Sequence, residues 1–76
     1  MTAEQMENRL KTAFPDADVA VIDLTGTEDH WEVRIASKLF KGLSRIDGQR
    51  KIMDVFGPEL KTGEVHALTI RTLVKE

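Results

Sequence analysis

The chain has 76 residues, of which 41% are hydrophobic and 32% are charged, and its formal net charge is -2. This length allows one domain over residues 1–76 with a small core, and this composition is typical of a folded protein rather than a disordered one. Because the sequence contains no cysteine, disulfides, thiolate metal ligands and cysteine-based catalysis are excluded from this chain.

The first predicted element is a helix over residues 3–14. Thr2 and Gln5 form a capping-box pattern, apolar residues then recur at helical spacing, and Pro15 ends the run. We therefore expect an amphipathic helix at the start of the chain.

Two strands are predicted next, in the segments DADVAVIDL and WEVRIAS, and the polar loop TGTEDH joins them. Trp31, Val33 and Ile35 share one face of the second strand, because side chains alternate along a strand. An antiparallel pair fits these two segments best.

The second half of the chain predicts two helices and a last strand. Ser44 and Asp47 mark the start of a helix over residues 45–56, and Gly57 with Pro58 ends it. PELKT is long enough for one more helical turn, which gives the outline of a helix-turn-helix segment. The apolar face of the first helix contains Ile46, Ile52, Met53, Val55 and Phe56. VHALTIRTLV then predicts a strand that carries on one side His66, Leu68, Ile70, Thr72 and Val74.

The predicted element order is αββααβ. A three-stranded sheet with all helices on one face gives a two-layer α+β fold, and its other face is left open for a partner.

Three segments of the sequence carry a family resemblance. WEVRIASKLF, the following KGLSRIDGQRKIM and the terminal VHALTI resemble the BolA-like family, whose α+β proteins have a KH-like topology of type II. The resemblance runs from Val21 to the end, with a matching amphipathic helix in front. It implies a non-enzymatic accessory protein that shares a [2Fe-2S] cluster with a monothiol glutaredoxin and glutathione, and that binds no cluster alone.

The resemblance also implies that His66, in the H-A-L motif, is a ligand of that cluster. Imidazole is a good ligand for iron, and it raises a cluster's potential when it replaces thiolate. The family's second ligand comes from the loop before the second strand, where this chain has Thr27, a poor ligand. His30 is the soft donor at the end of that loop, whereas Glu28 and Asp29 are hard donors more typical of solvated loops.

The sequence pattern alone leaves both histidines open to other interpretations. His66 could be a strand-opening residue hydrogen-bonded to a neighbouring carbonyl, and His30 could be a solvated loop residue. Alternation along the strands also places His30 and His66 on opposite faces of the sheet, so they converge only if the end of the loop twists.

Charge is distributed unevenly along the chain. Residues 1–30 carry seven acids and two bases, a net charge of -5, whereas residues 38–51 carry five bases and one acid, a net charge of +4. A basic segment that leads into a helix can hold a phosphate backbone. The bases that would do so are Lys38, Lys41, Arg45, Arg50 and Lys51.

This basic segment supports an alternative function, a transcriptional regulator that binds DNA. The pI of 5.6, the absence of a G-x-x-G loop and the single interleaved aromatic, Phe40, count against it. Under the first interpretation the same segment forms part of the rim that faces the glutaredoxin, through Phe40, Lys41, Gly42 and Arg45. A third possibility is an adaptor that binds the glutaredoxin without touching the cluster.

Family members typically carry an R-H-R-like triplet in this helix, where the chain has Gly48, Gln49 and Arg50. Glycine inside a helix costs about 1 kcal/mol relative to alanine. Gly48 therefore either loosens the helix or allows another backbone to approach closely.

The sequence contains no pattern that indicates an enzyme. It lacks a nucleophile with a neighbouring base, a phosphate-binding glycine loop and an HExxH motif. The polar N-terminus and the absence of a long apolar run predict a cytoplasmic protein with no membrane contact. Alone, it is expected to be a monomer or a weak homodimer.

Overall fold

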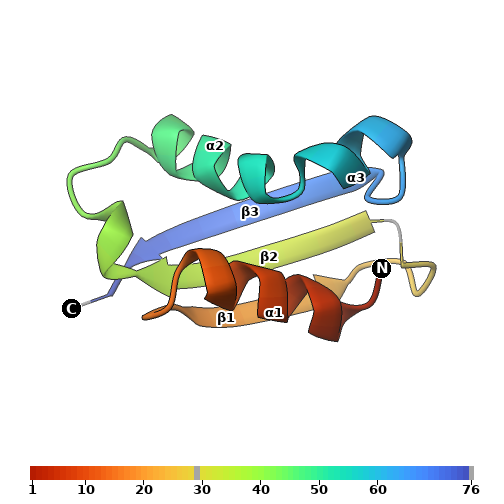
Figure 1. The fold of residues 1–76 in the computed structure, drawn as a ribbon, viewed down its shortest axis with the longest axis horizontal. Coiled ribbons are helices and arrows are strands. Elements are labelled where there is room, and N and C mark those ends of the chain that lie inside the picture. The colour runs from red at the N-terminus through yellow and green to blue at the C-terminus, as the bar shows by residue number, and fades with distance from the viewer. Residues whose placement is uncertain (29, 76) are drawn as a thin grey trace.

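The computed structural model describes residues 1–28 and 30–75, and the elements follow in the predicted order αββααβ (Figure 1). The helices are α1 (Ala3–Ala13), α2 (Arg45–Val55) and α3 (Gly57–Thr62), and the strands are β1 (Asp18–Asp23), β2 (His30–Ser37) and β3 (Ala67–Val74). A short 3-10 helix, η1 (Lys38–Phe40), follows β2 directly and has no counterpart in the prediction. None of the helices in the described residues has the length and apolar character needed to cross a membrane.

The sheet has the strand order β1-β2-β3. β1 and β2 are antiparallel, as predicted, whereas β2 and β3 are parallel. The connection between β2 and β3 carries α2 and α3, and such a crossover returns the chain in its original direction. Because His30 pairs with Ala67 and Ser37 pairs with Val74, β2 and β3 begin at one end of the sheet and finish at the other.

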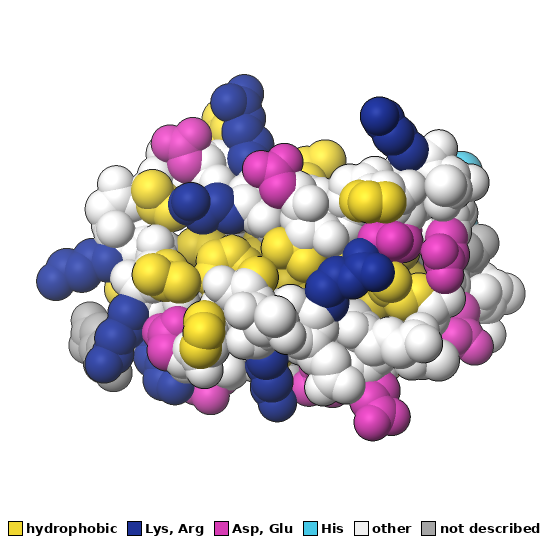
Figure 2. All heavy atoms as spheres, in the orientation of Figure 1, with side chains coloured by type: hydrophobic (Ala, Val, Ile, Leu, Met, Phe, Trp, Pro, Cys, Tyr) yellow, Lys and Arg dark blue, Asp and Glu magenta, His cyan; other side chains and the backbone are white. Residues whose placement is uncertain are grey.

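The helices cover one face of the sheet, and the core lies between the two layers. Trp31, Val33 and Ile35 are at most 1% exposed and confirm the predicted inner face of β2. Burying a side chain of this size contributes about 1.5–3 kcal/mol relative to leaving it exposed. The helices add to the core Met6, Leu10 and Ile52, and Phe56 between α2 and α3 joins them. Figure 2 shows hydrophobic side chains along the seam between α1 and α2, with charged side chains around them.

Local hydrogen bonds explain where the helices begin. The Gln5 backbone N–H donates to the Thr2 hydroxyl (3.2 Å) and the Thr2 N–H donates to the Gln5 side chain (2.9 Å), so the predicted capping box is confirmed. At α2 the Asp47 N–H donates to the Ser44 hydroxyl (3.1 Å). Both caps satisfy N–H groups that the first turn of a helix leaves without intrahelical partners.

The junction between α2 and α3 differs from the prediction. Gly57 and Pro58 open α3 instead of only ending α2, because proline is favoured in the first turn of a helix, where its missing N–H is not needed. The two helices are separated by Phe56 alone. This turn is shorter than the turn of about three residues found in DNA-binding helix-turn-helix motifs.

The predicted apolar face of α2 is only partly correct. Ile52 and Phe56 are fully buried, whereas Ile46 is 64% exposed and Met53 is 46% exposed. The stripe that faces the sheet runs through Gly48, Ile52 and Phe56, at a spacing of four residues. Ile46 and Met53, seven residues apart, therefore lie on a different side of the helix.

Candidate functional site

The two histidines of the chain lie together at one end of the sheet. His30 is the first residue of β2 and His66 immediately precedes β3. Their ring centroids are 5.3 Å apart, with an angle of 63° between the ring planes. Strand alternation predicts opposite faces for them, but His66 stands before the first paired residue of β3, so the alternation does not hold its ring on the helix side.

Buried neighbours anchor both histidines while the His66 ring stays outside. Val65 is fully buried and its N–H donates to the Glu59 carbonyl (3.2 Å), which fixes the chain just before His66. Trp31, next to His30, is 1% exposed. His66 itself is exposed, and no side-chain hydrogen bond to it is found within residues 1–28 and 30–75. Within these residues, the structure therefore does not show the alternative in which His66 is hydrogen-bonded to a neighbouring carbonyl.

The loop between β1 and β2 is organised around Asp23. Its carboxylate accepts hydrogen bonds from the N–H groups of Thr25 (3.3 Å), Gly26 (2.9 Å) and Glu28 (3.1 Å). The hydroxyls of Thr25 and Thr27 are 2.6 Å apart and form a hydrogen bond. Thr27 is thus a structural part of the loop. Asp29, considered above as a hard donor, lies outside the described residues.

The histidine pair has the chemistry of an incomplete metal site. No group of three or more His, Cys, Asp or Glu side chains suited to a metal is found among the described residues. From a nitrogen–metal distance of about 2.1 Å, two histidines on one tetrahedral metal have ring centroids roughly 5 Å apart. The observed 5.3 Å fits that separation. A metal held by the two imidazoles would need further ligands to complete a tetrahedral set.

The predicted partner rim lies at the other end of the sheet from the histidines. His30 is the first residue of β2, whereas η1 follows its last residue, Ser37. A strand of eight residues spans about 23 Å. Phe40 is 4% exposed and packs on Phe14 with 5.2 Å between ring centroids, while Lys41 and Gly42 are exposed. A partner bound at the histidines would reach Lys41 only if it covered the whole length of β2.

The five predicted bases are exposed, but they are not gathered in one depression. Arg45 lines a groove together with residues of β3. Lys51 lines a separate depression together with Phe14, at the end of α1. The basic segment is therefore divided between different surfaces. This distribution gives no specific support to a single phosphate-binding face.

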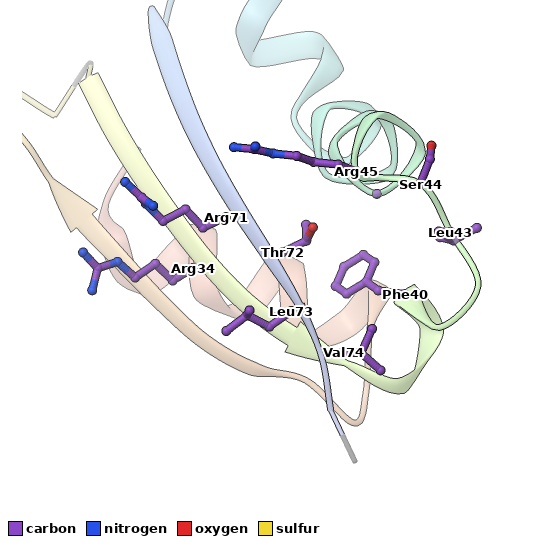
Figure 3. A pocket seen from close by; sticks show the side chains of 10 residues that line it. Arg34, Phe40, Leu43, Ser44, Arg45, Arg71, Thr72, Leu73 and Val74 are labelled. Carbon is purple, nitrogen blue, oxygen red and sulfur yellow. The ribbon is translucent and has the colours of Figure 1, made fainter.

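The groove beside β3 contains basic residues that the sequence analysis missed. Arg34 and Arg71 are opposite one another in the parallel pair and line it together with Arg45. Figure 3 shows Arg45 reaching from α2 toward β3, while Arg34 and Arg71 project from the side of the sheet away from α2. Glu32 and Arg34 alternate with the buried apolar residues of β2, and this pattern in the sequence could have indicated charged side chains on the open face of the strand. The partner, Arg71, could be identified only once the parallel register was known.

A nearly buried carboxylate joins two of these arginines. Glu32 is 9% exposed, although it lies on the open face of the sheet. It accepts hydrogen bonds from Nε of Arg34 (2.9 Å) and from Nε of Arg71 (3.3 Å). The two guanidinium groups cover the carboxylate and are themselves more than half exposed, with 57% and 64% of their side chains accessible.

Comparisons with known proteins agree with this architecture. The family model described as BolA-like protein matches residues 6–76. An uncharacterised protein of the rpoN-murA intergenic region of Acinetobacter guillouiae is 38% identical over 76 residues, covering 100% of this chain and 88% of the relative. The structure of BolA1 from Arabidopsis thaliana superposes with a TM-score of 0.85 at 28% identity, covering 95% of this chain and 89% of that one. The BolA domain of SufE1 from the same plant gives a TM-score of 0.85 at 28% identity, covering 95% and 90%.

Proposed function

This chain belongs to the BolA-like family, and from that premise we propose that it is an accessory protein that pairs with a monothiol glutaredoxin to bind, tune or transfer a [2Fe-2S] cluster. His66 would be its first ligand and His30 its second. The partner, with glutathione, would supply the thiolates that this cysteine-free chain lacks.

The observation that carries the proposal is that the imidazoles of His30 and His66 lie side by side at one end of the sheet. Their 5.3 Å centroid separation suits two nitrogens on one tetrahedral iron. The exposed position of His66 lets a second protein approach. No group of three or more candidate ligand side chains is found among the described residues, and we infer that a partner completes the site.

The chain's own residues would orient the ligands and set the cluster's properties. Val65 and Trp31, both buried, hold the backbone on either side of the site, so the two rings start close to their binding arrangement. Two imidazoles on one iron raise the reduction potential of a [2Fe-2S] cluster above that of an all-thiolate cluster. Ligation by histidine also makes the site sensitive to protonation.

The proposal is tested with a cluster-loaded monothiol glutaredoxin mixed with this protein. The visible circular dichroism spectrum of the cluster should change when the wild-type chain is added. When the His66→Ala variant is added instead, the spectrum should stay like that of the glutaredoxin alone. Pulsed electron paramagnetic resonance of the reduced mixed cluster should count two nitrogen ligands, and one with His30→Ala. Lys61→Ala, an exposed change at the end of α3, is the matched control and should behave as wild type.

Two results would contradict the assignment. If His66→Ala gives the wild-type spectrum, His66 is not a ligand. If the proteins associate while the spectrum of the cluster stays unchanged, the chain is an adaptor and does not contact the iron.

A further inference from the structure

A groove of about 800 Å³ lies beside the second half of β3, at the end of the sheet opposite the histidines (Figure 3). It is bounded by the start of α2, by the loop before it and by residues 71–74 of β3. Its volume is within the range of pockets that bind ligands, roughly 300–1,000 Å³. The groove shares no lining residue with the histidine site.

The groove runs along an edge of the sheet. β3 is the last strand in the order β1-β2-β3. The Lys75 N–H donates to the Ser37 carbonyl on the β2 side (3.3 Å). Since the N–H groups of successive residues point to alternate edges, those of Thr72 and Val74 point away from β2, toward the groove. An edge of this kind can accept an extended segment of another chain as an additional strand.

The charge of the groove is positive on both sides of that edge. Arg45 approaches from the helix side, and Arg71 lies on the open face of the sheet beside Arg34. No acidic side chain is among the described residues that line the groove, and Glu32 neutralises only part of the charge of the two sheet arginines. Side chains of an added strand would alternate between the two sides, so acidic residues on either face would meet an arginine.

Apolar side chains along the same edge would add contact area. Leu73 is 66% exposed and Val74 is 49% exposed, and Leu43 is half-buried at the groove wall. Exposed aliphatic side chains beside an unpaired edge are unusual, because natural proteins protect such edges from association.

We propose that this groove binds an extended acidic segment of a partner protein as a fourth strand on β3. A nucleic acid fits less well, because Phe40, the aromatic residue of the groove, is 4% exposed and offers no face for stacking bases. A second copy joined through its own β3 fits less well too, because it would bring positively charged residues such as Arg71 against one another. The proposal does not depend on the cluster function, since the groove and the histidines are at opposite ends of the sheet.

The test uses a fluorescent peptide of about eight residues built from Glu-Glu-Val-Val repeats, which places Glu on both faces of an extended strand. This length is within the usual range of strands, about 3–10 residues. Fluorescence anisotropy should show saturable binding, and amide resonances of Thr72 and Val74 should shift on titration. Arg45→Glu should weaken binding by about tenfold or more because it places like charges together. Arg50→Glu makes the same charge change on the same helix, outside the groove, and should have little effect. Far-UV circular dichroism checks that both variants are folded.

A second variant tests the edge itself. Val74→Pro removes an N–H that points into the groove but leaves the bonds to β2, so it should abolish peptide binding without unfolding the sheet. The proposal fails if the peptide does not bind, or if Arg45→Glu and Arg50→Glu weaken binding equally. It also fails if an oligonucleotide of equal charge binds the groove in preference, or if the groove is occupied by self-association that Arg45→Glu abolishes.

Discussion

Asp16 joins three separate parts of the chain. Its carboxylate accepts a hydrogen bond from the Lys38 N–H (2.8 Å) and one from the Ser37 hydroxyl (2.7 Å). Its carbonyl accepts one from the Lys75 ammonium (2.8 Å). The Lys38 N–H, the Ser37 hydroxyl and the charge of Lys75 hold the pKa of Asp16 below its usual value. Asp16 thus connects the turn before β1 with the end of β2 through its side chain, and with Lys75 at the end of β3 through its backbone carbonyl.

The lowered pKa of Asp16 predicts how stability depends on pH. The ionised form is favoured by folding, so its contribution is complete above the usual aspartate pKa of about 3.9 and is lost as pH falls through the lower pKa of the folded state. Asp16→Asn should lower the melting temperature at pH 7, and the difference from wild type should shrink as the solution is acidified. Thermal unfolding across that range measures both. A difference that stays constant with pH would show that the carboxylate charge is not involved.

At the scale of elements, Gly48 sets how closely α2 lies on β3. A Cβ atom at this position would be 3.3 Å from the Thr72 hydroxyl and 3.7 Å from the Phe40 ring. Of the two roles considered for Gly48, the structure supports close approach, although the neighbours are side chains and not another backbone.

This contact predicts different outcomes for a small and a large replacement of Gly48. Gly48→Ala gains about 1 kcal/mol in helix propensity, and a small rotation of Thr72 relieves the contact, so the variant should be nearly neutral or more stable. Gly48→Leu should lose about 1–3 kcal/mol, because it overpacks the interface. Urea denaturation measures both, with the exposed Arg50→Leu as control. Equal stability of the Leu and Ala variants would contradict close packing of α2 on β3.

The element order and the inner face of the sheet could be predicted because they depend on local patterns. The capping box at Thr2 and the alternation of Trp31, Val33 and Ile35 are such patterns, and both are confirmed. The exposure of Ile46 could not be predicted from its hydrophobicity. Which side of α2 faces the sheet depends on where Gly48 allows the two layers to approach.

The candidate site shows the same division between local and tertiary information. His66 could be singled out from its H-A-L motif, but its meeting with His30 depends on the parallel register of β2 and β3. The arginines of the groove likewise come from β2, β3 and α2 and are brought together only by the fold. The partner rim at Lys41 was predicted from its position and charge in the sequence, and the length of β2 separates it from the histidines.

At the scale of the whole molecule, the histidines and the basic groove occupy opposite ends of a body that measures 34 × 20 × 19 Å (Figure 1). The strands run along its longest axis. Arg34 and Arg71, the groove residues nearest the histidines, are four residues along their strands from His30 and Ala67. That distance is about 13 Å, which exceeds the Debye length at physiological salt, about 8 Å. A charge change at one end is therefore screened from the other.

This separation predicts that the two surfaces act independently. His66→Ala should leave the affinity for the acidic peptide unchanged, and Arg45→Glu should leave the visible circular dichroism of the mixed cluster unchanged. The double variant should show the sum of both effects, because changes at distant sites without shared partners add to within about 0.5 kcal/mol, or about twofold in affinity. Measuring both properties on the four proteins completes the cycle. A larger change in peptide affinity with His66→Ala would mean that β3, the strand common to both ends, transmits a rearrangement along its length.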